Sequence, residues 1–214
     1  MMRLRRLLSR IPVLSPLKAK MASWVRRALN RPKWRKLTHK GPVKLELGSG
    51  RKCGKDGWTT VDIRGADIEH DLRTGIPLKD NTVDAIYTSH MLEHIPYNDL
   101  IGFLVECRRV LKSGGYISVC VPNARQYIQA YIEGRNFRET AQLFQPAVVD
   151  TGSLIDQVNY IAYMGGQHAT LFDEENLVNT LKTAGFQTVK ARDFDPSIDL
   201  LVRDFGSIYA VAVK

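Results

Sequence analysis

From Val43 to the end of the chain, short apolar runs alternate with turn signals and with apolar residues at helical spacing. The short runs are bounded by glycine, asparagine or aspartate, which is typical of strands. This order of elements predicts an α/β domain whose 83–88 strand is apolar enough to be central. The predicted strands are 43–50, 58–63, 67–70, 83–88 and 116–123, and a predicted helix, Leu100–Leu111, ends at the stop signal 112–115.

The span 123–167 predicts a helical insertion in this domain, with one helix around 127–132 and a second around 154–162. Its aromatic residues either form a lid around a substrate or serve as the core of the insertion itself. Gly165 and Gly166 follow as a predicted hinge, and His168 comes just before the acidic start of another helix at Asp173. The aromatic residues are Tyr127, Tyr131, Phe137, Phe144, Tyr160 and Tyr163.

Charge divides the chain into a basic arm, residues 1–42, and the domain, residues 43–214. The arm holds 13 of the 31 basic residues and none of the 22 acidic ones, which leaves 18 basic residues in a mildly acidic domain. Residues 18–31 place Trp24 on the apolar face of a basic amphipathic helix, and prolines, including Pro32, divide the arm. Such a helix suits an anionic membrane surface. Packing on the domain, a transit peptide and an RNA-binding segment are the alternatives.

The overall composition excludes some classes of protein. Hydrophobic residues make up 44% of the chain and charged residues 25%, as in ordinary soluble domains. No apolar run reaches the roughly 20 residues of a membrane-spanning helix. The three cysteines form no C-x-x-C pair, so the pattern favours neither a disulfide framework nor a zinc knuckle and predicts a reducing cytoplasm.

The first predicted strand opens into a turn that contains Gly48 and Gly50, where glycine lets a ligand approach the backbone. Asp62 stands near the end of the next strand, where a carboxylate can accept hydrogen bonds from the two hydroxyls of a ribose. Asp71 follows the third strand and can accept from the exocyclic amine of adenine. Together these positions predict a nucleoside site.

Residues 90–94 read H-x-x-E-H, a spacing found on the metal-binding helices of zinc hydrolases. A strand running to about Thr88 and the proline at 96 leave room for at most two helical turns. Zinc also needs a third protein ligand, and nothing downstream singles one out. The sequence therefore predicts no metal here, and instead a pocket wall in which His90 or His94 is a candidate general base.

Beyond these separate motifs, LELGSG, the acidic residue after the second strand, the stretch HDL to SHMLEHI and CRRVLKSGGYISVCVP together resemble class I S-adenosylmethionine-dependent methyltransferases with a type 11 domain. The resemblance spans residues 43–214. It implies a Rossmann-like, mostly parallel seven-stranded sheet whose last strand, in 206–214, is antiparallel. It also implies S-adenosylmethionine as cofactor, held on its methionine side by Glu46, Gly48, Ser49, Gly50 and Arg51, at the ribose by Asp62 and Ile63, at the adenine by Asp71 and Leu72, and from beneath by Ser89 and His90. His94, His90 and His168 are the candidate catalytic bases.

The chain departs from this family where helices normally join the first three strands. Only residues 51–57 and 64–66 fill these gaps, too few for an ordinary crossover helix. We expect the sheet to expose an apolar face there, covered by arm residues 18–31 or by a second subunit in a homodimer.

The predicted function is methyl transfer from S-adenosylmethionine to a small molecule or a glycan or lipid-linked acceptor, at a hydroxyl. No D/N-P-P-Y segment typical of amino-methylating enzymes follows the fourth strand, where SHML stands instead. The predicted location is the cytoplasm, with residues 1–31 against the inner membrane face. The alternatives are an RNA methyltransferase and a catalytically degenerate scaffold.

Overall fold

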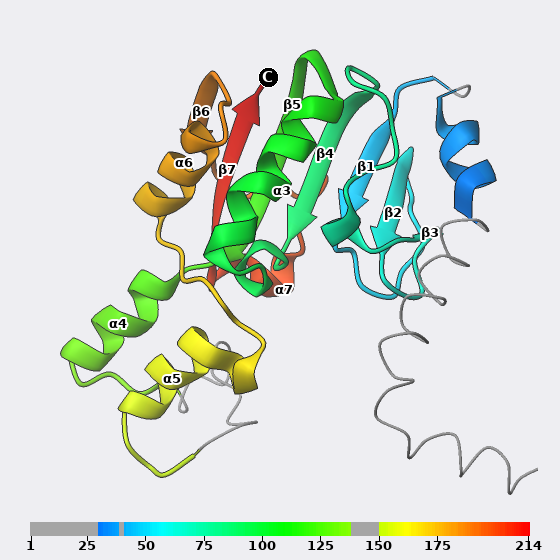
Figure 1. Ribbon diagram of the computed structural model, residues 1–214. Coiled ribbons are helices and arrows are strands. Elements are labelled where there is room, and N and C mark those ends of the chain that lie inside the picture. The colour runs from blue at the N-terminus through cyan, green and yellow to red at the C-terminus, as the bar shows by residue number, and fades with distance from the viewer. Residues whose placement is uncertain (1–29, 39–40, 138–149) are drawn as a thin grey trace, which may run out of the picture.

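The computed structural model describes residues 30–38, 41–137 and 150–214. A single seven-stranded sheet forms the centre, in the order β3-β2-β1-β4-β5-β7-β6 (Figure 1). All neighbouring strands from β3 to β5 are parallel, and β7 pairs antiparallel with both β5 and β6. The predicted Rossmann-like sheet with its antiparallel last strand is thus confirmed. The strands are β1 (Lys44–Leu47), β2 (Trp58–Asp62), β3 (Ile68–Glu69), β4 (Val83–Ser89), β5 (Leu111–Pro122), β6 (Thr188–Ala191) and β7 (Ser207–Val213).

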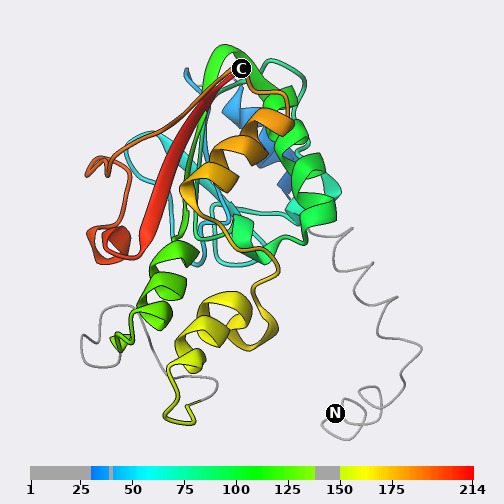
Figure 2. The same cartoon turned by 90° about the vertical axis from the view of Figure 1, so that its left-hand side faces the viewer.

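Helices α3 (Tyr97–Val110) and α6 (Glu174–Thr183) lie together on one face of the sheet (Figure 2). Their buried leucines pack on strand residues that share this face, such as Leu45, Ile86 and Val119. α3 begins directly after Pro96 and ends at Val110, where β5 starts without an intervening glycine cap. The predicted glycine stop at 114–115 is therefore wrong: these glycines lie within the first part of β5.

The opposite face of β1, β2 and β4 mixes polar side chains with Trp58, Ala85 and Tyr87 and is largely buried, so the expected exposed apolar face is a wrong prediction. In the register of these strands Glu46, Thr60 and Tyr87 stand side by side on this face. Tyr87 is buried there because its hydroxyl donates to Asp199, which also pairs with Arg192. Contacts from Asp199 and from Lys52 thus cover part of the face from which the two helices are missing.

No helix joins β1 to β2 or β2 to β3, as the short gaps predict. In place of the missing helices, a carboxylate holds these loops together by hydrogen bonds. Asp67 Oδ2 accepts hydrogen bonds from the backbone N–H groups of Gly54 at 2.8 Å and Thr60 at 3.1 Å. These contacts join the loop after β1 to the loop before β3.

The insertion contains two helices, α4 (Ala124–Ile132) and α5 (Ile155–Tyr163), that pack on each other. Tyr127 and Phe137 are buried with Ile161 in a small separate core, so these two aromatic residues are core, while Tyr131 and Tyr163 are exposed. The predicted apolar stripe of α4 is only partly buried, because Ala124 and Ala130 accompany Tyr127 inward in place of the isoleucines. Phe144 lies outside the described residues.

Residues 30–37 form a helix that includes Pro32 and packs against the β3 edge, so Pro32 does not separate two pieces there. Trp34 is buried and its ring meets that of His70 edge-on at 5.5 Å. Asn30 Nδ2 donates to the Glu69 carbonyl at 2.7 Å. This part of the arm therefore packs on the domain. The amphipathic segment 18–29 lies outside the described residues, and within the described ranges no helix is long and apolar enough to cross a bilayer.

Candidate active site at the carboxyl ends of the strands

The turn after β1 contains two glycines with left-handed backbone, Gly48 at φ +68° and Gly50 at φ +70°. A Cβ on Gly48 would clash with the side chain of Met91, whereas one on Gly50 would meet open space. The Met91 side chain thus makes a close approach that requires glycine at 48. The backbone at Gly50 borders open space instead.

Asp62, at the end of β2, holds this turn. Its Oδ2 accepts from the N–H of Gly50 at 2.9 Å and its Oδ1 accepts from the N–H of Ile63 at 2.6 Å. The carboxylate therefore lies directly beside the turn, as the nucleoside interpretation requires. Ile63 is about half exposed next to it.

The other predicted residues of this turn have different neighbours. The Glu46 carboxylate points from the polar sheet face to Lys52 Nζ at 2.5 Å. Lys52 is therefore engaged with Glu46. The Ser49 hydroxyl donates to the Gly50 carbonyl at 3.2 Å, and the side chain of Arg51 lies against Gly65.

Asp71 caps a short 3₁₀ helix, Leu72–Thr74, and accepts two hydrogen bonds from the guanidinium of Arg73, at 2.9 and 2.7 Å. These bonds hold the pKa of Asp71 below its usual value, so the carboxylate is ionised and is an acceptor at neutral pH. Leu72 is half-buried against the main core. The Asp71 carboxylate can accept from an amine only if it shares its oxygens with Arg73.

The end of β4 is strained and tied to the C-terminal part of the chain. His90 has φ +51°, a left-handed value that is uncommon for residues with a side chain and is often found at functional sites. Its Nε2 lies 2.8 Å from the hydroxyl of Ser207. The hydroxyl of Ser89 accepts from Arg203 Nη1 at 3.1 Å.

Immediately after this bend, a single 3₁₀ turn, Leu92–His94, carries a buried carboxylate into a group of imidazoles. Glu93 is 2% exposed, and its Oε2 has no hydrogen-bond partner among the described residues. His94 Nε2 and His90 Nδ1 lie 3.8 and 3.9 Å from its Oε1. The ring of His168 meets that of His94 at 5.1 Å. The structure thus brings the three predicted catalytic histidines together around Glu93.

Burial controls the ionisation of this cluster. It raises the pKa of Glu93 to about 7, opposed in part by its own backbone amide and by Arg203. It lowers the pKa of His90 to about 3, assisted by the charge of Arg203, and lowers the pKa of His168 as well. His90 and His168 are therefore neutral at pH 7 and supply no positive charge to Glu93.

Two residues of this region carry no signal in the sequence that predicts their position. Arg203 reaches Ser89 from 114 residues away along the chain, and His168 reaches His94 through a loop whose Ala169 N–H donates to the Glu93 carbonyl at 2.7 Å. The sequence identifies His168 only as a loop histidine and candidate base. The sequence identifies Glu93 only as the acidic residue of H-x-x-E-H.

The sequence and the fold both match known methyltransferases. Residues 42–119 match the family model of a methyltransferase domain. This part of the chain is therefore similar to methyltransferase domains, and the described chain has the fold of an S-adenosylmethionine-dependent methyltransferase. The domain is a methyltransferase, and S-adenosylmethionine is its cofactor.

The solved structures that resemble this methyltransferase are distant in sequence. A methyltransferase from Archaeoglobus fulgidus is 17% identical with a TM-score of 0.50, over 89% of this chain and 93% of that one. A possible histamine N-methyltransferase from Thermotoga maritima is 17% identical with a TM-score of 0.46, over 92% and 95% of the two chains. Phosphoethanolamine N-methyltransferase 2 from Haemonchus contortus is 13% identical with a TM-score of 0.48, over 86% and 52%. No curated protein matches the sequence significantly.

The residues at the carboxyl ends of β1 and β2 fit this cofactor. Gly50 leaves open space where its backbone faces outward, and Asp62 lies beside it with a carboxylate that ribose hydroxyls can bond. Asp71 supplies a second ionised acceptor beyond β3. The chemistry of these groups suits a nucleoside whose hydroxyls and amine are donors.

Proposed function

We propose that this methyltransferase transfers the methyl group of S-adenosylmethionine to a hydroxyl of a saccharide or lipid-linked acceptor. The observation that carries this proposal is the contact of Met91 with Gly48. Met91 lies between His90 and Glu93 in the chain, so the imidazole cluster directly adjoins the turn assigned to the cofactor. A group able to take a proton thus lies next to the methyl donor.

Methyl transfer is an in-line displacement: the acceptor oxygen forms a bond to the methyl carbon as the bond from carbon to the sulfonium sulfur breaks. The protein aligns the two groups and removes the hydroxyl proton. His94 is the best-placed base, because its Nδ1 lies 2.9 Å from the Gln167 carbonyl and must donate to it, which leaves a lone pair on Nε2. Its side chain is 38% exposed, whereas His90 is engaged with Ser207 and His168 is buried.

The cofactor contacts in this proposal are those of the family resemblance. Gly48, Ser49, Gly50 and Arg51 surround the methionine part, with Glu46 beneath them. Asp62 and Ile63 hold the ribose, Asp71 and Leu72 border the adenine, and Ser89 and His90 lie below the cofactor. The positions of Asp62 beside Gly50 and of Asp71 beyond β3 support this assignment.

Exposed apolar side chains on two helices near the same end of the sheet support an acceptor that carries a lipid. Helix α7 (Leu201–Asp204) exposes 77% of Leu201 and 86% of Val202, and α4 exposes 75% of Ile132. Gln126 of α4 donates to the Phe205 carbonyl at 2.9 Å, which joins the two segments. Figure 1 places both beyond the carboxyl ends of the parallel strands. Arm residues 1–31 would add basic contacts to an anionic membrane, and a second subunit would be a further partner.

Transfer of a labelled methyl group to a panel of saccharide, lipid-linked saccharide and RNA acceptors tests the proposal. We expect label on a hydroxyl of a lipid-linked saccharide, and its transfer should fall when Leu201 and Val202 are both replaced by Glu. Replacement of exposed Val105 by Glu, on the helix face of the sheet, is the matched control. Label only on RNA, or only on nitrogen, would contradict it.

RNA is the second candidate acceptor because of a basic hollow at the opposite end of the sheet. This hollow of about 740 Å³ lies at the starts of β1 and β2 and is lined by Trp58 and by Lys33, Lys36, Lys44 and Lys55. RNA binding there would weaken steeply with salt, because cations are released from the phosphates. Liposome binding that is lost on deletion of residues 1–31 would favour the membrane instead.

A further inference from the structure

Glu93 has no cation in direct contact, and Arg203 acts on its carboxylate only from a distance. Its carboxylate is buried, its Oε2 has no hydrogen-bond partner among the described residues, and the groups beside its other oxygen are imidazole nitrogens. A buried carboxylate normally has a charged partner, hydrogen-bond donors or a metal ion. None of these contacts brings a positive charge next to the Glu93 carboxylate.

The hydrogen bonds of the three imidazoles determine which ring nitrogen carries the proton. His94 Nδ1 and His168 Nδ1 each bond a backbone carbonyl, of Gln167 at 2.9 Å and of Ile161 at 2.7 Å. A carbonyl only accepts, so both Nδ1 atoms carry hydrogen and both Nε2 atoms keep a lone pair. This arrangement, with Nδ1–H on a carbonyl, is the one that fixes metal-binding histidines.

In His90 the roles of the two ring nitrogens are exchanged: Nε2 carries the hydrogen and Nδ1 keeps the lone pair. The Ser207 hydroxyl donates its hydrogen to the Arg203 carbonyl at 2.7 Å, so His90 Nε2 must donate to that hydroxyl. The lone pair of His90 then lies on Nδ1, 3.9 Å from Glu93 Oε1. Each of the three rings therefore keeps an unprotonated nitrogen, and all three rings are gathered around one carboxylate.

The sequence alone singles out no third metal ligand beside Glu93 and His94, and the fold supplies one. His168 offers a ligand atom that lies, with those of Glu93 and His94, in a group whose members are all within 4.8 Å of one another. His168 is brought there because the Ala169 and Thr170 N–H groups both donate to the Glu93 carbonyl. The short helical turn after β4 does not prevent binding, since the ligands come from a turn and a loop.

We propose that Glu93, His94 and His168 form a binding site for one divalent transition-metal ion of the zinc type. Two imidazoles and a carboxylate are a ligand set of zinc enzymes, and imidazole disfavours magnesium and calcium, which prefer oxygen ligands. Ligand atoms on a tetrahedral zinc lie about 3.3 Å apart, so the 3.8 Å between His94 Nε2 and Glu93 Oε1 closes by a small movement. His94 is partly exposed and gives the ion a path from solvent.

Three protein ligands leave one position open, as in catalytic zinc sites. If the proposed function holds, an acceptor hydroxyl occupies this position, loses its proton to bulk water because the cation lowers its pKa, and then attacks the methyl carbon. The oxygen–carbon bond forms and the carbon–sulfur bond breaks, leaving the cofactor as a neutral thioether. With the ion bound, His94 acts on the proton through the metal rather than by accepting it.

Metal analysis and calorimetry on the full chain, first stripped with a chelator and then titrated with Zn²⁺, test the site directly. We expect one Zn²⁺ per chain, and a visible Co²⁺ spectrum of low-coordinate type when cobalt replaces zinc. Glu93→Gln, His94→Gln and His168→Gln should each weaken Zn²⁺ binding by at least about tenfold. His70→Gln, which removes a buried imidazole that bonds the Gly75 carbonyl elsewhere in the fold, is the matched control and should leave Zn²⁺ binding unchanged.

Glu93→Gln keeps the shape of the side chain, and its circular dichroism spectrum shows whether the variant folds. Should His168→Gln fail to fold, the other two variants still decide the matter. Absence of stoichiometric Zn²⁺ binding, or binding that Glu93→Gln and His94→Gln leave unchanged, would overturn the proposal. S-adenosylmethionine binding is measured separately, so loss of the metal site and loss of the methyltransferase function give different results.

Discussion

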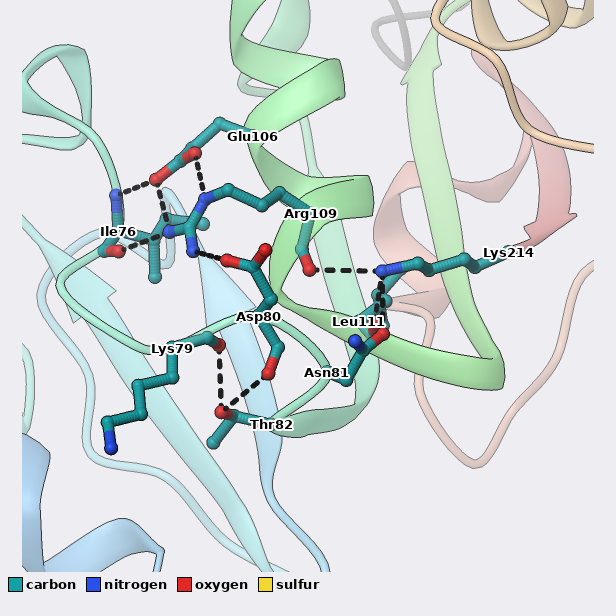
Figure 3. Close-up of polar contacts among 9 residues, drawn as sticks. All are labelled: Ile76, Lys79, Asp80, Asn81, Thr82, Glu106, Arg109, Leu111 and Lys214. Atoms are coloured by element: carbon teal, nitrogen blue, oxygen red, sulfur yellow. Dashed lines mark hydrogen bonds and ion pairs between the residues drawn. The ribbon is translucent and has the colours of Figure 1, made fainter.

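Charged or titratable side chains cluster at both ends of β4, but the two clusters differ in how these side chains are paired. At the start of the strand, Glu106 and Asp80 surround the guanidinium of Arg109 (Figure 3). Glu106 also accepts from the Ile76 N–H at 2.7 Å, and Arg109 returns a hydrogen bond to the Ile76 carbonyl at 3.0 Å. Lys214 Nζ donates to three oxygens nearby.

At the other end of the strand, Glu93 is buried beside imidazoles whose free nitrogens accept rather than donate. His90 has a left-handed backbone and Gly48 is pressed by Met91. The difference teaches that charge count alone does not distinguish structural from functional clusters. The start of β4, where Glu106 and Asp80 pair with Arg109, is the matched end and stabilises the fold. The end of β4, where Glu93 Oε2 lacks a partner among the described residues, is the unmatched end and can bind a proton, a metal ion or a substrate.

The largest predicted effect is on the rate of methyl transfer, and it arises from a substitution at the unmatched end. His94→Gln should lower the rate of methyl transfer by about 10²- to 10⁴-fold, whether His94 acts as base or as ligand. The free energy of unfolding should change by less than about 1 kcal/mol, because the side chain is partly exposed. Single-turnover methyl transfer and urea denaturation measure the two effects. Asp80→Asn at the other end is the control and should leave the rate unchanged.

A second prediction concerns the strain in the turn beside the cluster. Gly48→Ala and Gly50→Ala both force a side chain into left-handed backbone, at a cost of about 1–2 kcal/mol each. Gly48→Ala should lose about 1 kcal/mol more, because its Cβ meets Met91. Adding Met91→Ala to each should recover part of that extra loss, and only in the Gly48 variant, because the Cβ of residue 91 stays 2.7 Å from the new Cβ. Equal losses in the two glycine variants would contradict the packing of Met91 on the turn.

At the matched end, Glu106→Ala should lower the free energy of unfolding by about 1–2 kcal/mol. It leaves the Ile76 N–H and part of the Arg109 guanidinium without their acceptor, and water replaces some of these bonds because the site is partly exposed. Urea denaturation measures the loss. Methyl transfer at saturating substrate should persist, and a loss of activity as large as that of His94→Gln would end the distinction between the two clusters.

The smallest predicted effect is a dependence on pH at the same end. Hydrogen bonds from Arg109 hold the pKa of Glu106 below its ordinary value of 4.5. The ion pair therefore stabilises the fold above about pH 4.5, and this contribution is lost as pH falls through the lowered pKa. The stability difference between the native protein and Glu106→Gln should shrink between pH 5 and pH 3. A difference that stays constant over this range would show that the pair contributes nothing.

The sequence predicted every strand of the sheet except β6 (Thr188–Ala191), because apolar runs and glycine turns are local patterns. It also contained the alternation of Leu45, Glu46 and Leu47, which gives β1 one polar face, but the short gaps were taken to expose apolar surface instead. The approach of His168 to Glu93 was beyond prediction, since it depends on a loop pairing with a backbone carbonyl 76 residues earlier in the chain. Contacts of this kind leave no periodic trace.

The central claim is that S-adenosylmethionine binds where the turn after β1 meets Asp62. Calorimetric titration of the cofactor into the native protein and into Asp62→Ala tests it most directly, with thermal unfolding as the check on the fold and Asp56→Ala as the control. Loss of hydrogen bonds to an ionised carboxylate weakens binding by about 10- to 100-fold. We predict that weakening for Asp62→Ala alone. Equal affinity in the two proteins, or no binding by either, would contradict the account.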